Sequence, residues 1–384
     1  MPNRILVVGE YGTLNGGENS FLAVAPWLIK RGWQFHAAVP IDSDFASQLR
    51  ATGIGIHDLS LQNPAGQRKT QFELRSDIAQ LIGRVDPELI HCNSLSTSRI
   101  CAPVARELSV PSLGYLRDIL KLSNQAIADI NLLDRIIAVS LATRQWHCQQ
   151  GIKQERTSVV YNGVDTDLFF PSANSGSIET LCPIRSEFGI PADASVLLYV
   201  GQIGIRKGVD TLVDAFLAVA ESVPRAQLLI VGQRHSQKQE AIEYEDQLRT
   251  STESSIHRHR IHWLGNRTDI PMLMRAATIL VHPARQEPLG RVLLEAAASG
   301  LPIVTTCVGG SPEILQSREL QRLLVSPDDP MELSARVLSL IGNAQWLQRL
   351  GPQLRKLAKQ TFSIENCARE LDAHYRRLLD QRRY

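Results

Sequence analysis

The sequence predicts an α/β protein with two domains, each built on a parallel β-sheet. Its 384 residues exceed the roughly 250–300 at which a single hydrophobic core stops growing. Short apolar runs alternate with amphipathic stretches along the whole chain, a pattern typical of repeated βα units. A stretch rich in Pro, Ser and Gly at about residues 170–190 interrupts this alternation, and the pattern then starts again.

The first half, residues 1–170, contains six short apolar runs that we expect to be strands. Its opening run ends at a glycine and is too short for the apolar core of a signal peptide, so we expect a strand there. The six expected strands are Arg4–Val8, Phe35–Val39, Leu89–His91, Ser112–Tyr115, Ile136–Val139 and Ser158–Tyr161.

The second half, residues 190–362, repeats the pattern and predicts a second Rossmann-like domain of similar size. Residues 364–384 have apolar side chains at helical spacing, but periodicity alone does not say which domain this helix contacts. Ligands bind outside the carboxyl ends of parallel strands, so two such domains facing each other would enclose a central cleft. The six expected strands of this half are Ser195–Val200, Gln227–Val231, Ile261–Leu264, Ile279–Val281, Ile303–Thr305 and Arg322–Val325.

Composition excludes several classes of protein. The net charge of +2 gives no support to nucleic-acid binding. The six cysteines form no C-x-x-C pair or Cys/His spacing for zinc, so we expect free thiols in a reducing compartment. No apolar window of about 20 residues predicts a transmembrane helix. We therefore expect a cytoplasmic protein, and peripheral membrane contact through Lys30, Arg31 and Trp33 stays open.

Two glycine-containing loops are expected to approach a ligand. Gly16 and Gly17 precede an apolar-periodic helix, and their tight turn would present backbone N–H groups at the helix start. A turn needed only for close packing is an equal alternative. In the second half, Arg206 and Lys207 stand next to Gly208, just before another helix. Two cations beside the positive end of a helix dipole suit a diphosphate, although an Arg-Lys pair can also be simply solvated.

The stretch "RQEPLGRVLLEAAASGLPIV" contains two glutamates eight positions apart. Pro288 and Gly300 predict a helix over about 289–299, which places Glu287 in the preceding loop and Glu295 inside the helix. Free N–H groups at the helix start would meet a ligand anion. Glu295 is flanked by apolar residues and needs a partner, for which the two hydroxyls of a ribose are suitable donors. An ordinary surface glutamate is the alternative.

The segment "EPLGRVLLEAAASGLPIVTTCVGG" resembles the E-x7-E region of retaining glycosyltransferases of the GT-B fold, family 4. Other segments resemble the same family in the expected order. They are "NGGE" after the first strand, "DRIIAVSLATRQWHCQQGIKQERTSVVYNGVDTDLFFP" at the end of the first domain, the loop "GQIGIRKGVDTLVDAF", and "VGGSPEIL".

The resemblance implies a role for each candidate residue. Glu295 would bind the ribose hydroxyls of a nucleotide-sugar, and Glu287 would lie beside the donor's sugar ring. Arg206 and Lys207 would neutralise the departing diphosphate without a metal ion, and the C-terminal helix would return to the first domain. The expected catalytic residues are Glu287, Arg206 and Lys207, and the expected donor-binding residues add Gly16, Gly17, Gly201, Pro288, Leu289, Gly290 and Glu295.

Two positions depart from the family pattern. Many members have an arginine where this chain has Gln202, so more of the diphosphate's charge would rest on Arg206 and Lys207. Many also have a histidine where this chain has Arg117 and Asp118. Arg117 is therefore a candidate near the donor sugar. His91, at the end of an earlier strand, is either a further candidate or a structural histidine.

These observations predict a retaining, metal-independent glycosyltransferase that needs no cofactor. It would move a sugar from a nucleotide diphosphate-sugar to an acceptor, which is a glycan, a lipid-linked molecule or a small molecule, held mainly by the first domain. Two alternatives stay open because fold does not determine function. One is a nucleotide-sugar epimerase of the same fold, and the other is a non-catalytic nucleotide-sugar-binding protein.

Overall fold

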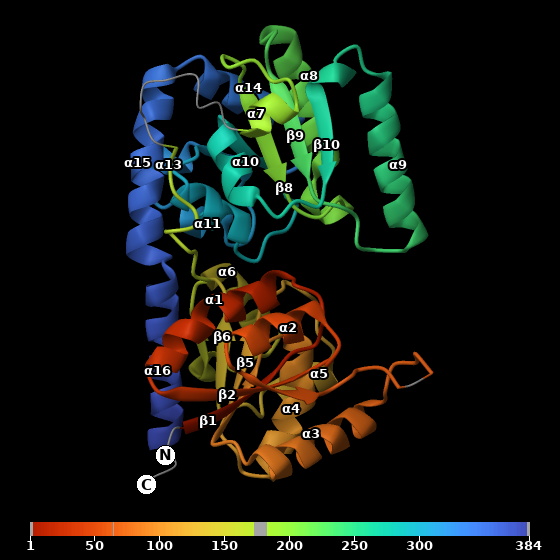
Figure 1. Cartoon of the computed structure of the whole chain (residues 1–384), viewed down its shortest axis with the longest axis vertical. Coiled ribbons are helices and arrows are strands. Elements are labelled where there is room, and N and C mark those ends of the chain that lie inside the picture. The colour runs from red at the N-terminus through yellow and green to blue at the C-terminus, as the bar shows by residue number, and fades with distance from the viewer. Residues whose placement is uncertain (1–2, 64, 173–182, 382–384) are drawn as a thin grey trace. The chain divides into compact units, whose positions relative to one another are not determined.

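The computed structural model describes residues 3–63, 65–172 and 183–381, and the chain forms two compact units (Figure 1). The first unit comprises Met1–Gly163 and Ile364–Tyr384, and the second comprises Val164–Ser363. Much of the expected linker (173–182) and the last residues of the expected C-terminal helix (382–384) lie outside the described residues.

The first unit is built on a parallel sheet with the strand order β3-β2-β1-β4-β5-β6-β7. The strand over Gly55–Asp58 was not predicted from the sequence. It lies at the sheet edge and its side chains are exposed or half-buried, so it has no apolar run. The strands are β1 (Asn3–Val8), β2 (Trp33–Val39), β3 (Gly55–Asp58), β4 (Leu89–Cys92), β5 (Ser112–Leu116), β6 (Arg135–Ala138) and β7 (Thr157–Val159).

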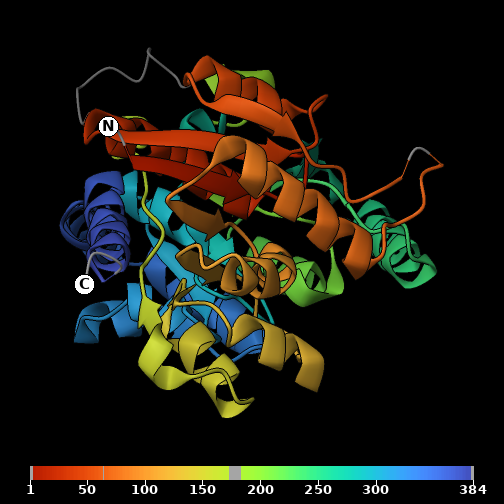
Figure 2. The same ribbon diagram turned by 90° about the horizontal axis from the view of Figure 1, so that it is seen from below.

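The last helix of the chain contacts the first helix and β4 of the first unit. Tyr375 is fully buried there, and Trp33 donates a hydrogen bond from Nε1 to Asp372 Oδ1 (2.7 Å). Between β3 and α3 the chain makes a long excursion that extends away from the sheet in both views (Figures 1 and 2). The helices of this unit are α1 (Gly16–Lys30), α2 (Asp44–Ala51), α3 (Gln71–Val85), α4 (Leu95–Glu107), α5 (Asn124–Ile130), α6 (Leu141–Gln149) and α16 (Ile364–Asp380).

The second unit has a parallel sheet with the strand order β10-β9-β8-β11-β12-β13. Its central strands are almost completely buried, as expected of a parallel sheet covered on both faces. The last strand begins at Leu324, two residues later than predicted. The strands are β8 (Val196–Val200), β9 (Gln227–Val231), β10 (Ile261–Gly265), β11 (Ile279–His282), β12 (Ile303–Thr306) and β13 (Leu324–Val325).

Helices cover this second sheet, with α8 packed against α14 and α11 against α15. Figure 1 shows α9 on the β10 side of the sheet, away from α15. The helices are α7 (Pro183–Glu187), α8 (Val209–Ser222), α9 (Gln239–Ser254), α10 (Ile270–Ala276), α11 (Arg291–Ala298), α12 (Ser311–Ile314), α13 (Arg318–Gln321), α14 (Pro330–Ile341) and α15 (Ala344–Thr361).

Each sheet reverses its strand order once, between β1 and β4 in the first unit and between β8 and β11 in the second. The loops that follow these two neighbouring strands diverge to opposite faces of the sheet, which leaves a crevice outside their carboxyl ends. The predicted site residues lie mainly in the loops at these two reversal points.

Candidate functional site

The loops after β8 and β11 meet at the reversal point of the second sheet. Gly208 has φ 65°, and a Cβ atom there would lie 2.1 Å from the carbonyl oxygen of Pro283. Only glycine allows this close approach without a backbone shift. The backbone N–H of Arg285 also donates to the carbonyl oxygen of Arg206 (2.9 Å). The two loops are therefore joined through their backbones.

Lys207 and Glu287, one from each loop, form a largely buried ion pair. Lys207 Nζ lies 2.6 Å from Glu287 Oε2, and their side chains are 15% and 9% exposed. His282, the last residue of β11, donates from Nε2 to the same oxygen (2.8 Å). Burial alone would raise the pKa of Glu287. The charge of Lys207 and the hydrogen bond from His282 outweigh burial and hold this pKa well below its usual range.

Arg285 lies in the loop after β11, and its side chain connects this loop to the loop after β8. Its guanidinium pairs with Asp210 (2.6 Å) in the first turn of α8 and with Asp328 (2.5 Å). It also donates to the carbonyl oxygen of Ile205. These contacts hold the short 3-10 helix η2 (Ile205–Lys207), which carries both predicted phosphate-binding cations.

Helix α11, which follows the β11 loop, begins later than predicted. Helix α11 starts at Arg291, and its N-cap is Gly290 with φ 97°, a left-handed conformation that favours glycine. Pro288 and Leu289 therefore belong to the loop, and the prediction that the helix starts at 289 was wrong. Proline often occupies the first position of a helix, which made the sequence signal misleading. Here Pro288 and Leu289 both lie in the loop before the helix, and the side chain of Leu289 is buried.

Glu295 lies inside α11, as predicted, but its partner comes from its own helix. Arg291, four residues earlier, donates from Nη2 to Glu295 Oε1 (3.2 Å). Burial raises the pKa of Glu295, and Arg291 offsets this only in part. The pKa of Glu295 therefore lies above its usual value, whereas that of Glu287 lies below it.

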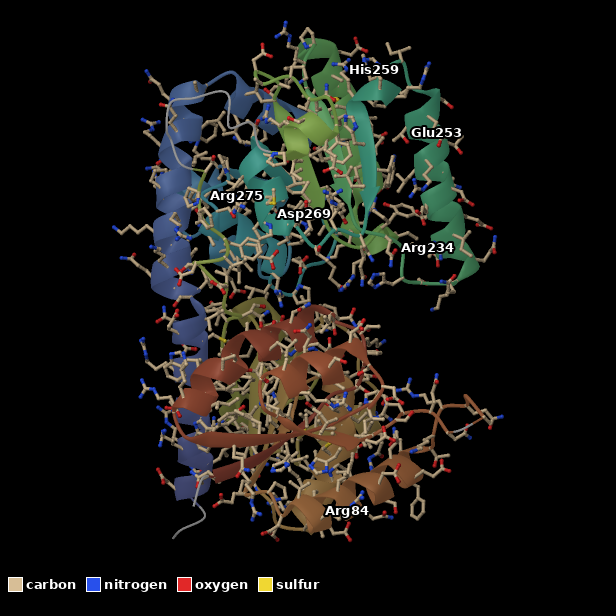
Figure 3. All side chains as sticks on the ribbon, in the orientation of Figure 1. Arg84, Arg234, Glu253, His259, Asp269 and Arg275 are labelled. Atoms are coloured by element: carbon tan, nitrogen blue, oxygen red, sulfur yellow. The ribbon has the colours of Figure 1, made fainter. Side chains whose placement is uncertain are left out.

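A pocket of about 170 Å³ opens beside the same loop. Arg206 and Lys207 line it from one side, and the segment after β9 lines it from the other with His235 and Lys238. Gln202, which follows Gly201 at the end of β8, lies 2.9 Å from His235 through its Nε2 and the histidine Nδ1. In Figure 3, Arg234 of the same segment lies beside one end of α9 and Glu253 lies farther along that helix.

In the first unit, the candidate residues gather at the reversal between β1 and β4. Helix α1 begins at Gly16, so both glycines lie in its first turn and not in a turn before it, which corrects the prediction. A Cβ atom on Gly17 would lie 3.1 Å from Arg117 Cδ. Arg117 donates to the side-chain oxygens of Asn93 (2.9 Å) and Asn162 (3.1 Å), which connects the loop after β5 to the loop after β7.

His91 is fully buried and makes structural contacts. Its Nδ1 lies 2.5 Å from the hydroxyl of Tyr375 on α16, and its ring stacks on Tyr115. Burial, followed by the charge of Arg117, lowers the pKa of His91 to about 3. The ring is therefore neutral, and its placement favours the structural alternative for this residue.

The segment considered for membrane contact is only partly exposed. Lys30 and Arg31 are at the surface, but Trp33 is 3% exposed and packs against Tyr375. The suggestion that Trp33 touches lipid was wrong because the indole fills the space between β2 and α16. Across the described residues, no helix has both the length and the apolar character needed to cross a membrane.

Sequence reasoning missed His282, Arg285 and Arg291. His282 carried a usable signal, because it directly follows the predicted strand Ile279–Val281, at the carboxyl edge of the sheet where ligands bind. The pairing of Arg291 with Glu295 was also detectable from its i,i+4 spacing. Arg285 carried no such signal, because both of its carboxylate partners are distant in sequence.

Comparison with known proteins follows the two-unit organisation. Residues 14–168 match the model of Glycosyltransferase Family 4, and residues 183–357 match that of Glycosyl transferases group 1. The chain is 28% identical to spore coat protein SA of Bacillus subtilis over 58% of this chain and 59% of that protein. It is 32% identical to the lipopolysaccharide glucosyltransferase WaaG of Escherichia coli over 50% of this chain and 48% of WaaG. The matches thus span about half the length of these two relatives.

Solved structures share the fold over the whole chain. The structure of Anabaena Alr3699/HepE in complex with UDP-glucose has a TM-score of 0.82 at 24% identity, covering 97% of this chain and 98% of that chain. Sucrose-phosphate synthase from Thermosynechococcus elongatus has a TM-score of 0.77 at 21% identity, covering 99% and 100%. Two family matches that together span both units, on a shared GT-B fold, show that the chain belongs to glycosyltransferase family 4, the group 1 glycosyl transferases.

Proposed function

We propose that the protein is a retaining glycosyltransferase that uses a nucleotide diphosphate-sugar. The second unit binds the donor, and the first unit, completed by α16, binds the acceptor. The observation that carries the proposal is the junction of the β8 and β11 loops. There Arg206, Lys207 and Glu287 lie at the carboxyl edge of the sheet, close to the start of α11.

This arrangement suits the departure of a nucleoside diphosphate. The bond between the anomeric carbon and the β-phosphate oxygen breaks, and a new bond to the acceptor oxygen forms on the same face of the sugar. The acceptor's hydroxyl proton passes to the leaving phosphate oxygen. Arg206, Lys207 and the positive end of the α11 dipole stabilise the developing negative charge. Glu287 stabilises the cation-like sugar, and Glu295 binds the ribose hydroxyls.

UDP-glucose is the first donor to test, because it occupies the related Alr3699/HepE structure. Purified protein is screened by thermal shift against UDP-, GDP-, ADP- and dTDP-sugars, and the best donor is then tested with glycan, lipid-linked and small-molecule acceptors. We expect nucleoside diphosphate release that depends on the acceptor and a product with retained anomeric configuration. A donor sugar that is isomerised without an acceptor would instead show an epimerase.

The reaction is proposed to need no divalent metal, because two cations and a helix dipole already face the diphosphate. Activity should survive EDTA. A loss of activity that Mn²⁺ restores would overturn this part of the proposal. We place the reaction in the cytoplasm, consistent with the unpaired cysteines of the described residues.

A further inference from the structure

His282 is the last residue of β11 and contacts the side chain of Glu287. It is 1% exposed, and its Nε2 lies 2.8 Å from Glu287 Oε2. Its chemistry depends on which nitrogen carries the proton.

The contacts assign the proton to Nε2. An ionised carboxylate can only accept hydrogen bonds, so the nitrogen that faces Glu287 must be the donor. The other nitrogen, Nδ1, is buried and has no hydrogen-bond partner among the residues that the structure describes. A second proton on Nδ1 would be a buried donor without an acceptor, which is unfavourable. The ring is therefore a neutral donor.

The ring is also held in one orientation. Tyr199 of β8 lies nearly parallel to it, with 6.4 Å between the ring centroids and 12° between the planes. The hydroxyl of Tyr199 donates in turn to the carbonyl oxygen of Gln202 (2.8 Å). A ring fixed by its neighbours can orient a carboxylate more firmly than the flexible stem of a lysine can.

Lys207 and His282 share Glu287 Oε2, and no described residue contributes a hydrogen bond to Oε1. In the proposed function, Lys207 also has to meet the leaving diphosphate. We propose that His282 is a positioning residue that keeps the Glu287 carboxylate oriented, with Oε1 toward the donor sugar, when Lys207 turns to the phosphates. This inference rests on the proposed function, but it can be tested separately from it.

The first test compares two substitutions of His282. His282→Gln places an amide N–H near the position of Nε2, whereas His282→Leu fills a similar volume without a donor. We expect His282→Leu to lower kcat by about tenfold to a hundredfold, the effect of one lost hydrogen bond to a charged group, with donor KM changed less than about threefold. His282→Gln should recover most of kcat. The matched control is His262→Leu, because His262 is a partly buried histidine on β10 that bonds Gln227 instead.

The second readout is the pH profile. The titratable groups facing Glu287 are Lys207, His282 and Tyr199, and Arg206 adds its charge near the imidazole. Loss of His282 removes one contribution that lowers the pKa of Glu287, so the acidic limb of the kcat profile should move to higher pH in His282→Leu and move less in His282→Gln. Equal kcat and equal profiles in wild type and His282→Leu would overturn the inference.

A third measurement does not need activity. ¹⁵N NMR of histidine-labelled protein should show a neutral His282 protonated on Nε2, and ¹³C NMR should show the Glu287 carboxyl titrating at higher pH in His282→Leu. A cationic ring, an Nδ1–H tautomer or an unchanged Glu287 titration would refute the positioning role. If no donor supports transfer, the proposed function fails, and these spectra still decide the role of His282.

Discussion

A buried carboxylate keeps its charge only when its partners replace the water that it has lost. Glu287 has two such partners on one oxygen, the ammonium of Lys207 and the imidazole of His282. Glu295, about one turn into α11, has the guanidinium of Arg291 on one oxygen. The two carboxylates are held differently, and we expect different kinetic roles.

The first prediction separates these two glutamates. In the proposed function Glu295 contacts the ribose both before and during the reaction, so Glu295→Gln should raise the donor KM. Glu287→Gln should lower kcat by about 10²–10³ with little change in donor binding, since the sugar becomes cationic only in the transition state. Steady-state kinetics with varied donor measures both effects.

Glu253→Gln on the exposed face of α9 is the matched control and should leave both constants unchanged (Figure 3). Donors that lack a ribose hydroxyl add a second check, because the Glu295 variant should discriminate against them less than the wild type does. An identical kinetic defect in both glutamate variants would contradict the division of roles.

The second prediction concerns the Lys207–Glu287 pair and pH. The pKa of Glu287 is depressed in the folded protein. Its stabilising contribution is therefore fully present above the unfolded pKa of about 4.3 and is lost as pH falls through the folded pKa. Lys207→Met should raise the folded pKa and lower the unfolding free energy at pH 7 by about 3 kcal/mol.

The difference between wild type and Lys207→Met should shrink from pH 7 to pH 3, because Glu287 becomes protonated in the variant. Urea unfolding across this range measures it. Lys356→Met, at an exposed position of α15, should show no such dependence. A difference that stays constant with pH would mean that the two side chains are not coupled.

At the scale of elements, the site depends on two loops that touch where the strand order reverses. The contact of Gly208 with Pro283 and the pairing of Arg285 with Asp210 keep η2 against the β11 loop. The cations and the carboxylate come from elements about 80 residues apart in sequence. Their distance is therefore set by how closely these loops pack.

The third prediction tests that packing. Gly208→Ala should lower the unfolding free energy by about 2 kcal/mol or more, because alanine is strained at this positive φ and its Cβ would collide with the Pro283 carbonyl. Nucleoside diphosphate binding should weaken as well. Gly204→Ala is the control in the same loop, since a Cβ atom there has open space and an extended backbone. Equal unfolding free energies for the two variants would show that the close contact is unimportant.

At the scale of the whole molecule, the chain leaves the first unit at residue 163 and re-enters it at residue 364. The returning helix α16 is a structural part of the first unit. Tyr375 packs against Trp33 and His91, and Gly163 lies so close to Ile364 that a Cβ atom would be 2.7 Å from its Cα.

The fourth prediction is that Tyr375→Ala destabilises the first unit by about 3–5 kcal/mol, the usual effect of removing a buried aromatic ring. Hydrogen exchange followed by mass spectrometry should show faster exchange in β1, β2 and β4, with the second unit unchanged. Arg377→Ala, at an exposed position of the same helix, should leave exchange as in the wild type. Faster exchange in the second unit would show that the two units do not unfold independently.

The sequence by itself determined the α/β class, the presence of two parallel sheets and most of their strands. Buried parallel strands are continuous apolar runs, such as those of β8 and β9. It also placed Glu287 in a loop and Glu295 in a helix, since proline and glycine limit a helix locally. The edge strand β3 escaped prediction because half-exposed strands lack an apolar run.

Only the tertiary structure decided which side chains meet. Strand order places β8 beside β11, which brings Lys207 to Glu287 and Arg285 to Asp210. In the first unit, the return of α16 buries Trp33, and the packing of two loops brings Arg117 to Asn162. Helix and turn preferences act between neighbours in the chain, whereas these contacts depend on the packing of segments that are distant in sequence, and local patterns carry no information about that packing.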